Sequence, residues 1–284
     1  MSTLVTPAFP RSRAVVDGSG GTFAAPERTG STNADLLAVA TDRPHGSVVA
    51  TLDQTAGRGR LDRSWSAPAG QTLAASLLVR ADLSDRDRGW LPLVAGAAMR
   101  TAVSAVLPGV DDAGRASRPT DPVPRSGAPT VAVKWPNDVL VDDRKVCGIL
   151  CQVASDGSVV VGAGVNLTIP ADAMPTPTAT SLAVAGATAG AAALADAVLS
   201  VFHTTVLEAV AALAAGAADA QAVRCGVRAA CGTIGRHVRL ELPDGTVVEA
   251  EATGIDDDGR ITIRDRDGRS RGVAVGDLTH LRYA

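Results

Sequence analysis

The sequence predicts an α+β fold, in which a mixed, mainly antiparallel sheet with packed helices is followed by a small C-terminal β-barrel. Hydrophobic residues make up 46% of the 284-residue chain, which is ample for a buried core. Short apolar runs bounded by turn residues alternate with long stretches of helical periodicity. From Gly232 onward the pattern changes to short alternating strands separated by Asp-Gly turns, which is typical of a small barrel.

The predicted elements divide the chain into three regions. Residues 1–25 are rich in Pro, Gly, Ser and Thr, and they predict a flexible leader. Residues 26–231 form the main predicted domain, in which the segment 109–129, dense in Pro, Asp, Arg, Ser and Gly, is expected to be a disordered insertion. Residues 232–284 form the predicted barrel.

Each element has its own signature in the sequence. Thr32-Asn33-Ala34-Asp35 is typical of a capping box and predicts a helix that runs through Ala40. Apolar runs predict a meander of mainly antiparallel strands at 47–52, 72–79, 131–135, 139–141, 146–153 and 159–169. Periodicity predicts helices at 87–107, 188–214 and 219–230, with Trp90 on the core-packing face of the first. In the barrel we expect strands at 238–242, 247–255, 260–264 and 271–275.

Charge and composition exclude several classes of function. The chain has 27 basic and 30 acidic residues, a net charge of -3, so there is no overall attraction to nucleic acid or acidic membranes. The amino terminus has no secretory pattern, and the Ala-rich segment 186–216 contains Asp196, His203 and Glu208. We therefore expect a cytoplasmic protein without a membrane span, in which any anion site is local.

The cysteines and histidines do not form a metal-binding pattern. Cys147, Cys151, Cys225 and Cys231 lack Cys-x-x-Cys spacing, and the first two are expected about 13 Å apart along one strand. Reduced, structural thiols are therefore expected. The histidines, which are scattered through unrelated segments and are expected to be structural or surface residues, are His45, His203, His237 and His280.

A glycine–arginine segment from Gly57 to Trp65 is the clearest candidate for an anion site. It contains three arginines, Arg58, Arg60 and Arg63, between two predicted strands. Glycine has no side chain, so its backbone can lie close to a ligand. A guanidinium group can donate two parallel hydrogen bonds to the oxygens of one phosphate or carboxylate group. For Trp65, stacking on a planar ligand and structural packing are both open interpretations.

Two further segments place polar or small residues at strand positions. Lys134-Trp135-Pro136-Asn137-Asp138 ends a strand with a cation, an amide and a carboxylate, and Pro136 takes the chain out of the ladder. Such a terminus alone is more often a solvated turn, but beside an arginine-rich segment it indicates an anion site. The strand 162–167 carries two glycines, which fit either close approach of a ligand or a bulge.

Together these segments resemble the biotin protein ligase family. The strings that carry the resemblance occur in the family's order over most of residues 31–170: Ser31-Thr32-Asn33, 54–60 (Gln-Thr-Ala-Gly-Arg-Gly-Arg), 134–138, Cys147-Gly148-Ile149-Leu150 and 162–167. The resemblance implies a catalytic domain of the class II aminoacyl-tRNA synthetase type that binds biotin and ATP, followed by an SH3-like domain. It also implies a two-step reaction: biotin and MgATP give biotinyl-5'-AMP and pyrophosphate, and a lysine of a biotin carboxyl carrier domain of acyl-CoA or pyruvate carboxylases takes the biotinyl group.

The resemblance also implies roles for single residues. Catalysis falls to Lys134, Arg58, Arg60 and Asp138, of which Asp138 is expected either to bind Mg²⁺ or to act as a base. The residues implied around biotin are Ser31, Thr32, Asn33, Gln54, Arg58, Gly59, Arg60, Lys134, Gly148, Ile149 and Leu150. Those implied around ATP and the adenylate are Arg58, Arg60, Arg63, Trp65, Lys134, Asn137, Gly162, Ala163, Gly164 and Asn166.

Two alternatives and two further expectations accompany this interpretation. A lipoate or octanoate ligase or transferase shares the fold, although the Gly-Arg-Gly-Arg segment and the C-terminal barrel favour biotin. A non-catalytic sensor of biotin is disfavoured because no DNA-binding pattern precedes Ser31, and for the same reason we expect no repressor role. Because its arginines repel one another, we also expect the segment 57–66 to be poorly ordered without ligand and to close over biotinyl-AMP as a lid.

Overall fold

A seven-stranded mixed sheet is the framework of the larger part of the chain. The computed structural model describes residues 9–60, 63–65, 67–110, 128–242, 244–274 and 277–280. Neighbouring strands are antiparallel, except that β1 and β2 are parallel. The strand order is β1 (Phe23–Ala24), β2 (Val48–Thr51), β5 (Thr72–Val79), β9 (Val159–Asn166), β8 (Arg144–Val153), β7 (Asp138–Val141) and β6 (Val131–Lys134).

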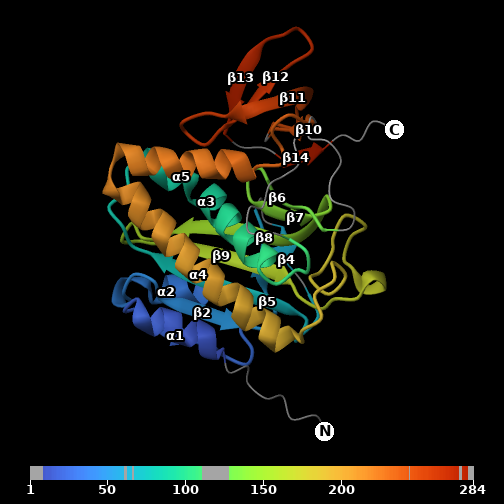
Figure 1. Ribbon diagram of the computed structural model, residues 1–284. Helices are drawn as coiled ribbons and strands as arrows, with labels where there is room; N and C mark the ends of the chain where they lie inside the picture. The colour runs from blue at the N-terminus through green and yellow to red at the C-terminus, as the bar shows by residue number, and fades with distance from the viewer. Residues whose placement is uncertain are drawn as a thin grey trace.

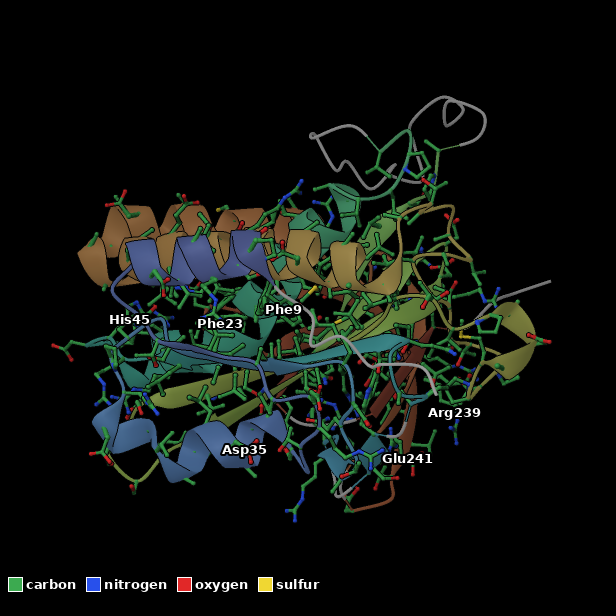
Figure 2. The ribbon with its side chains drawn as sticks, turned by 90° about the horizontal axis from the view of Figure 1, so that it is seen from below. Phe9, Phe23, Asp35, His45, Arg239 and Glu241 are labelled. Carbon is green, nitrogen blue, oxygen red and sulfur yellow. The ribbon has the colours of Figure 1, made fainter. Side chains whose placement is uncertain are left out.

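The two faces of this sheet are covered by different helices. Long helices α3 (Asp85–Ser104) and α4 (Ala191–Ala215) lie on one face, and the short α2 (Thr32–Ala38) lies on the other (Figures 1 and 2). Because side chains alternate along a strand, Val161 and Val165 of β9 enter the main core while Val160 packs beneath α2 with Leu36 and Leu78. The α2 face has the smaller apolar cluster, which leaves room there for polar residues.

The predicted leader is wrong for residues 9–24, which form helix α1 (Pro10–Gly18) and strand β1. Pro10 lies in the first helical turn, where proline is favoured. The side chains of Phe9 and Val16 are buried, and the Phe9 and Phe23 rings lie 5.7 Å apart between centroids (Figure 2). This helix is too short to be stable alone and has little periodicity, so its stability comes from packing on α4. Residues 1–8 lie outside the described part of the chain.

The other predicted elements are present, with boundaries shifted by a few residues. The predicted capping-box helix is α2, whose N-cap is Ser31, and α5 (Ala217–Ala230) follows α4 as expected. The predicted glycine–arginine segment contains a short hairpin of β3 (Gly57–Arg58) and β4 (Ser64–Trp65), while Leu61, Asp62 and Ser66 are not described. Most of the predicted insertion, residues 111–127, is also outside the described residues.

The C-terminal part forms a separate five-stranded antiparallel sheet beside α5 and the β6–β7 end of the larger sheet (Figure 1). Its buried side chains include Leu240 and Ile263. The structure adds one strand, β14, that the sequence did not predict. The strand order is β13 (Ser270–Val273), β12 (Ile261–Arg264), β11 (Val247–Ile255), β10 (His237–Glu241) and β14 (Asp277–His280).

Helix α4 is an apolar core helix. Among the described residues it meets the length and composition of a membrane span. It packs, however, against α1, α3 and α5, and buries Leu194, Val198 and Phe202 among them. Its apolar composition therefore follows from its central position among the helices.

Asp196 joins α4 to α1, and we predict that its loss destabilises the fold. Its carboxylate accepts hydrogen bonds from the backbone N–H of Ser12 at 2.8 Å, from the Ser12 hydroxyl at 2.8 Å and from the backbone N–H of Arg11 at 3.0 Å. Asp196→Ala leaves these buried donors without partners, so the free energy of unfolding in urea should fall by about 1–3 kcal/mol. The exposed Asp172→Ala is the control and should change it by less than about 0.5 kcal/mol. Equal stabilities of the two variants would contradict this role for α1.

Candidate functional site

A cavity of about 170 Å³ opens on the α2 face of the central strands. Of the residues predicted for the site, all but Lys134 and Asn166 line it, and Ser64 and Lys145 line it without having been predicted. The lining residues come from α2 with its N-cap, the β2–β3 loop, the β3–β4 hairpin, the β6–β7 turn and strands β7, β8 and β9. They are Ser31, Thr32, Asn33, Gln54, Arg58, Gly59, Arg60, Arg63, Ser64, Trp65, Asn137, Asp138, Lys145, Gly148, Ile149, Leu150, Gly162, Ala163 and Gly164.

Glycines in β8 and β9 form the floor of this cavity. Gly148 lies directly opposite Gly164, and Gly162 lies between Leu150 and Ser76 on the two neighbouring strands. A Cβ atom at Gly162 would lie 2.1 Å from Oδ1 of Asn33. The register of β9 is continuous with both neighbours, so β9 has no bulge here. The groups that approach its glycines are the side chains of Asn33 and Trp65, and close approach of a ligand stays a prediction.

The amide of Asn33 connects α2 to the sheet. Its Oδ1 accepts a 2.6 Å hydrogen bond from the Ser76 hydroxyl, and its Nδ2 donates to the Gln152 side chain at 2.8 Å and to the Leu150 carbonyl at 3.2 Å. Both amide N–H groups are thus bonded to protein. Ser76 and Gln152 were not predicted, although a serine within the apolar run 72–79 was a signal that this face holds polar groups.

Gln54 fixes the N-terminal end of α2. Its Oε1 accepts hydrogen bonds from the backbone N–H of Thr32 at 2.9 Å and from the Thr32 hydroxyl at 3.3 Å. A Cβ at Gly57 would lie 2.5 Å from Nε2 of Gln54, so the glycine lets the hairpin pack against this side chain. The first turn of α2 and the start of the hairpin therefore form one polar end of the cavity.

The β3–β4 hairpin places Trp65 over the glycine floor. A Cβ at Gly164 would lie 2.8 Å from the indole ring, and a Cβ at Gly148 would lie 3.5 Å from it. Nζ of Lys145 lies 5.6 Å from the ring centroid, within the range of a cation–π interaction. The indole is half-buried in the cavity wall, away from the main core. Closure of the hairpin as a lid stays a prediction.

Lys145 and Asp138 form an ion pair in the wall of the cavity. Their Nζ and Oδ1 atoms are 2.6 Å apart, and Nζ of Lys134 lies 3.8 Å from the other carboxylate oxygen. Lys145 is on β8, next to the glycine-bearing β9, whereas Lys134 is on the edge strand β6. Lys134, which the sequence predicted in the site, contacts Asp138 but is not among the residues that line the cavity.

A register shift puts Lys145 on this face. Val139 pairs with Cys147 but Leu140 pairs with Lys145, so Val146 is an extra residue in β8. Counted back from Gly148 by simple alternation, Lys145 would face the core. Instead Val146 and Cys147 both enter the core, and Lys145 returns to the cavity face beside Asp138.

Asn137 links the hairpin to the end of the β6–β7 turn. Its Oδ1 accepts a hydrogen bond from Nη1 of Arg60 at 3.2 Å, and its Nδ2 donates to the Ile149 carbonyl at 2.8 Å. Asn166, by contrast, was predicted in the site but is buried outside it. Its Nδ2 donates to the Thr180 carbonyl at 2.9 Å, because the segment that follows β9 folds back over the end of this strand.

The charged residues of the cavity favour an anion. Among the described lining residues four are basic, Arg58, Arg60, Arg63 and Lys145, and one is acidic, Asp138. The acidic group is already paired with Lys145. The cavity therefore combines one polar end, an apolar glycine floor and one cationic end, as a site for a small molecule that carries a negative charge requires.

No metal cluster was found among the described residues, since no group of three or more His, Cys, Asp or Glu side chains is placed to hold an ion. The cysteines are free thiols. Burial raises the pKa of Cys147 and Cys231, and it raises the pKa of Cys151 to about 12. These three thiols are therefore protonated and unreactive near neutral pH.

The chain is similar to biotin ligases over most of its length. Residues 25–168 match the biotin/lipoate A/B protein ligase family, and residues 233–277 match the biotin protein ligase C-terminal domain. The biotin–[acetyl-CoA-carboxylase] ligase of Mycobacterium tuberculosis is 38% identical over 258 residues, which cover 90% of this chain and 87% of that protein. The bifunctional ligase/repressor BirA of Escherichia coli is 30% identical over 154 residues, 53% of this chain and 42% of that protein.

Solved structures show the same fold. The biotin protein ligase from Aquifex aeolicus in complex with biotin and ATP superposes with a TM-score of 0.67 at 20% sequence identity. The superposition covers 92% of this chain and 99% of that one. The α+β architecture with a small C-terminal sheet, as the sequence predicted, is thereby confirmed.

Thiol reactivity tests the environment of the cavity wall. Cys225 is exposed on α5, whereas Cys147, Cys151 and Cys231 have raised pKa values. With Ellman's reagent at about pH 8, the native protein should show one fast-reacting thiol, because the three thiols with raised pKa values stay protonated and do not attack the disulfide. Cys225→Ser should abolish the fast phase. A fast-reacting thiol that remains in Cys225→Ser would contradict the raised pKa of Cys147, Cys151 or Cys231.

Proposed function

This chain belongs to the biotin/lipoate A/B protein ligase family, and we infer that it is a biotin protein ligase that activates biotin with ATP and passes the biotinyl group to a protein lysine. The observation that carries this inference is the glycine-floored cavity with one polar and one cationic end. The match of residues 233–277 to the biotin protein ligase C-terminal domain favours biotin over lipoate.

The first step joins two anions, which explains the cationic end. A carboxylate oxygen of biotin attacks the α-phosphorus of ATP, the bond from this phosphorus to the bridging oxygen breaks, and pyrophosphate leaves with the bonding electrons. The enzyme needs no nucleophile of its own, so catalysis rests on positioning and on neutralising charge at the phosphoryl oxygens. We assign the charge neutralisation to Arg58, Arg60 and Lys145, which line the cavity together.

The polar end fits the ring system of biotin. We propose that Ser31, Thr32 and Gln54 bind the ureido group, since hydroxyl, amide and backbone groups meet there. The bicyclic ring would lie along Gly148 and Gly164 beneath Trp65. Asn33 supports the polar end of the cavity without donating to biotin, because both N–H groups of its amide are bonded to Gln152 and Leu150 and its oxygen accepts from Ser76.

At the cationic end we propose that Lys145 takes the role that the sequence resemblance suggested for Lys134. Lys145 lines the cavity and is held by Asp138 at 2.6 Å, so its ammonium group is fixed before substrate arrives. Asp138 then acts as the residue that positions Lys145. The adenine and ribose would lie toward Trp65, Asn137 and the β3–β4 hairpin.

The residues present do not form a Mg²⁺ cage. Asp138 is the one carboxylate among the described lining residues, and two lysines already contact it. Mg²⁺ binds readily through phosphates and water with few protein ligands. We therefore propose that the ion arrives with ATP and is held mainly by the nucleotide.

In the second step the neutral amine of an acceptor lysine attacks the acyl carbonyl of the adenylate, an amide bond forms, the amine releases one proton to solvent, and AMP leaves with the bonding electrons of the acyl–oxygen bond. We propose a biotin carboxyl carrier domain of an acyl-CoA or pyruvate carboxylase as the acceptor; the name of the Mycobacterium tuberculosis relative supports an acetyl-CoA carboxylase. We propose the cytoplasm as the place of the reaction.

The two lysines give a direct test of the assignment. We predict that Lys145→Met lowers the rate of biotin-dependent pyrophosphate release by about 100-fold or more, since it removes a charge from the phosphoryl centre. Lys134→Met, the matched control on the other side of Asp138, should lower it by less than about tenfold. Pyrophosphate release is measured with a coupled phosphate assay on folded variants. A larger loss of rate in Lys134→Met than in Lys145→Met would assign the charge neutralisation at the phosphoryl group to Lys134.

The function itself is tested with biotin, ATP and a purified biotin carboxyl carrier domain. The expected result is pyrophosphate release with biotin, followed by a mass increase of the carrier domain by one biotinyl group. Lipoate in place of biotin should give neither product. Activation of lipoate without activation of biotin would overturn the proposed function.

A further inference from the structure

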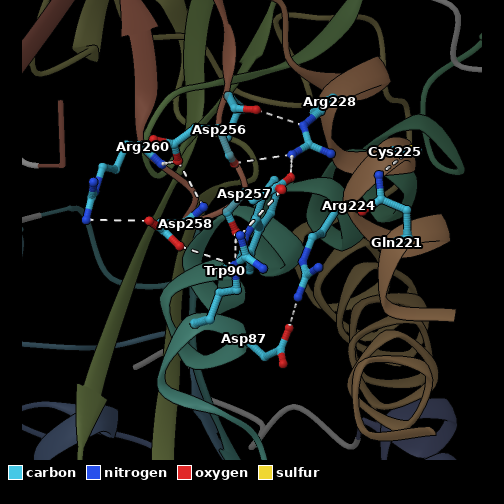
Figure 3. Close-up of polar contacts among 12 residues, drawn as sticks. Asp87, Trp90, Gln221, Arg224, Cys225, Arg228, Asp256, Asp257, Asp258 and Arg260 are labelled. Atoms are coloured by element: carbon cyan, nitrogen blue, oxygen red, sulfur yellow. Dashed lines mark hydrogen bonds and ion pairs between the residues drawn. The ribbon is translucent and has the colours of Figure 1, made fainter. Parts of the chain in front are cut away.

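A turn of the C-terminal sheet, residues 256–259 between β11 and β12, docks on the larger part of the protein. The indole N–H of Trp90 donates to the Asp257 carbonyl at 2.8 Å, and that of Trp135 donates to the Gly259 carbonyl at 3.1 Å. Arg228 of α5 pairs with the Asp257 carboxylate at 2.9 Å (Figure 3). One turn is therefore held by two tryptophans from different elements.

Hydrogen bonds within the turn itself hold its conformation. Oδ1 of Asp256 accepts hydrogen bonds from the backbone N–H of Asp258 at 2.9 Å and of Arg260 at 3.0 Å. Gly259 has a φ of +79°, a conformation that favours glycine, and its N–H donates to the Asp256 carbonyl at 3.2 Å. The Gly259 carbonyl is thus a fixed acceptor for Trp135.

Trp135 is held at a second point by the C-terminal part of the chain. Its backbone N–H donates to the Thr233 hydroxyl at 3.1 Å, and that hydroxyl lies 3.0 Å from Nε2 of His280. The side chain of Trp135 is buried, with 1% of its surface exposed. Backbone and ring are therefore both fixed by residues that follow α5.

The segment that Trp135 holds leads directly into the active site. Asn137 and Asp138 follow it, and they bond to Arg60 and Lys145 respectively. A second cavity of about 180 Å³ lies beside this segment, with Trp135 and Gly259 among its lining residues. On the side of this cavity the segment has fewer packing contacts, so the hydrogen bonds of Trp135 contribute more to its position.

We propose that Trp135 is a positioning residue: its indole N–H, held by the Gly259 carbonyl, sets Asn137 and Asp138 and through them the cationic end of the site. The C-terminal sheet thereby contributes to adenylate formation without entering the cavity, and this role rests on the proposed function. Trp90 makes the same kind of bond to the same turn, but it belongs to α3, and none of the α3 residues lines the substrate cavity, whereas Asn137 and Asp138 close to Trp135 do.

The test compares Trp135→Phe with Trp90→Phe in the full chain. Each substitution removes one indole N–H from the turn, so both should lower the urea midpoint by similar amounts. Trp135→Phe should lower kcat of biotin-dependent pyrophosphate release by about tenfold, with KM for biotin within about twofold of the wild type. Trp90→Phe should leave both constants within about twofold. An unchanged kcat in Trp135→Phe, or an equal decrease of kcat in both variants, would overturn the proposal.

Amide hydrogen exchange gives a readout that does not need turnover. The Ile149 N–H donates to the Asn137 carbonyl at 2.8 Å, so its exchange should accelerate in Trp135→Phe and not in Trp90→Phe. If the wild type fails to release pyrophosphate, the proposed function fails while the exchange rates still decide the role of Trp135. Should Trp135→Phe not fold, Thr233→Val serves as the second variant, because it removes the hydrogen bond to the Trp135 backbone N–H. It should also lower kcat and accelerate exchange of the Ile149 N–H.

Discussion

The lack of a side chain at Gly148, Gly162 and Gly164, on one face of β8 and β9, is the constraint on which the rest of the site depends. Gly148 faces Gly164 across the two strands, and Gly162 lies two pairs further along, on the same face of the sheet. The same strands are filled with Val and Ile on the opposite face, where they form the main core. One strand pair therefore supports both a close-packed core and an open cavity, and the rigidity of the first preserves the shape of the second.

The groups that occupy this bare face come from distant parts of the chain. Asn33 lies over Gly162, and Trp65 lies over Gly164 and Gly148. Each is held by hydrogen bonding or charge: Asn33 by Ser76 and Gln152, and Trp65 through its contact with Lys145. The cavity is consequently preorganised, which suits a reaction that depends on bringing two anions together.

Local signals in the sequence predicted most of the fold and much of the site. The glycine–arginine segment and the glycine pair of β9 were recognisable because their residue types are unusual in strands and hairpins. Lys145 was missed because its face depends on the extra residue at Val146, which simple alternation does not reveal. Helix α1 was missed for a related reason: its stability comes from long-range contacts with Asp196 on α4.

Binding of biotin to Gly162→Ala tests the dependence on a bare strand face most directly. The added methyl group overlaps the Asn33 amide, whose hydrogen bonds to Ser76 and Gln152 prevent it from moving aside. Isothermal titration should show the Kd for biotin raised by about tenfold or more, whereas Gly226→Ala, at an open position on α5, should leave it unchanged. A wild-type Kd in folded Gly162→Ala would contradict the account.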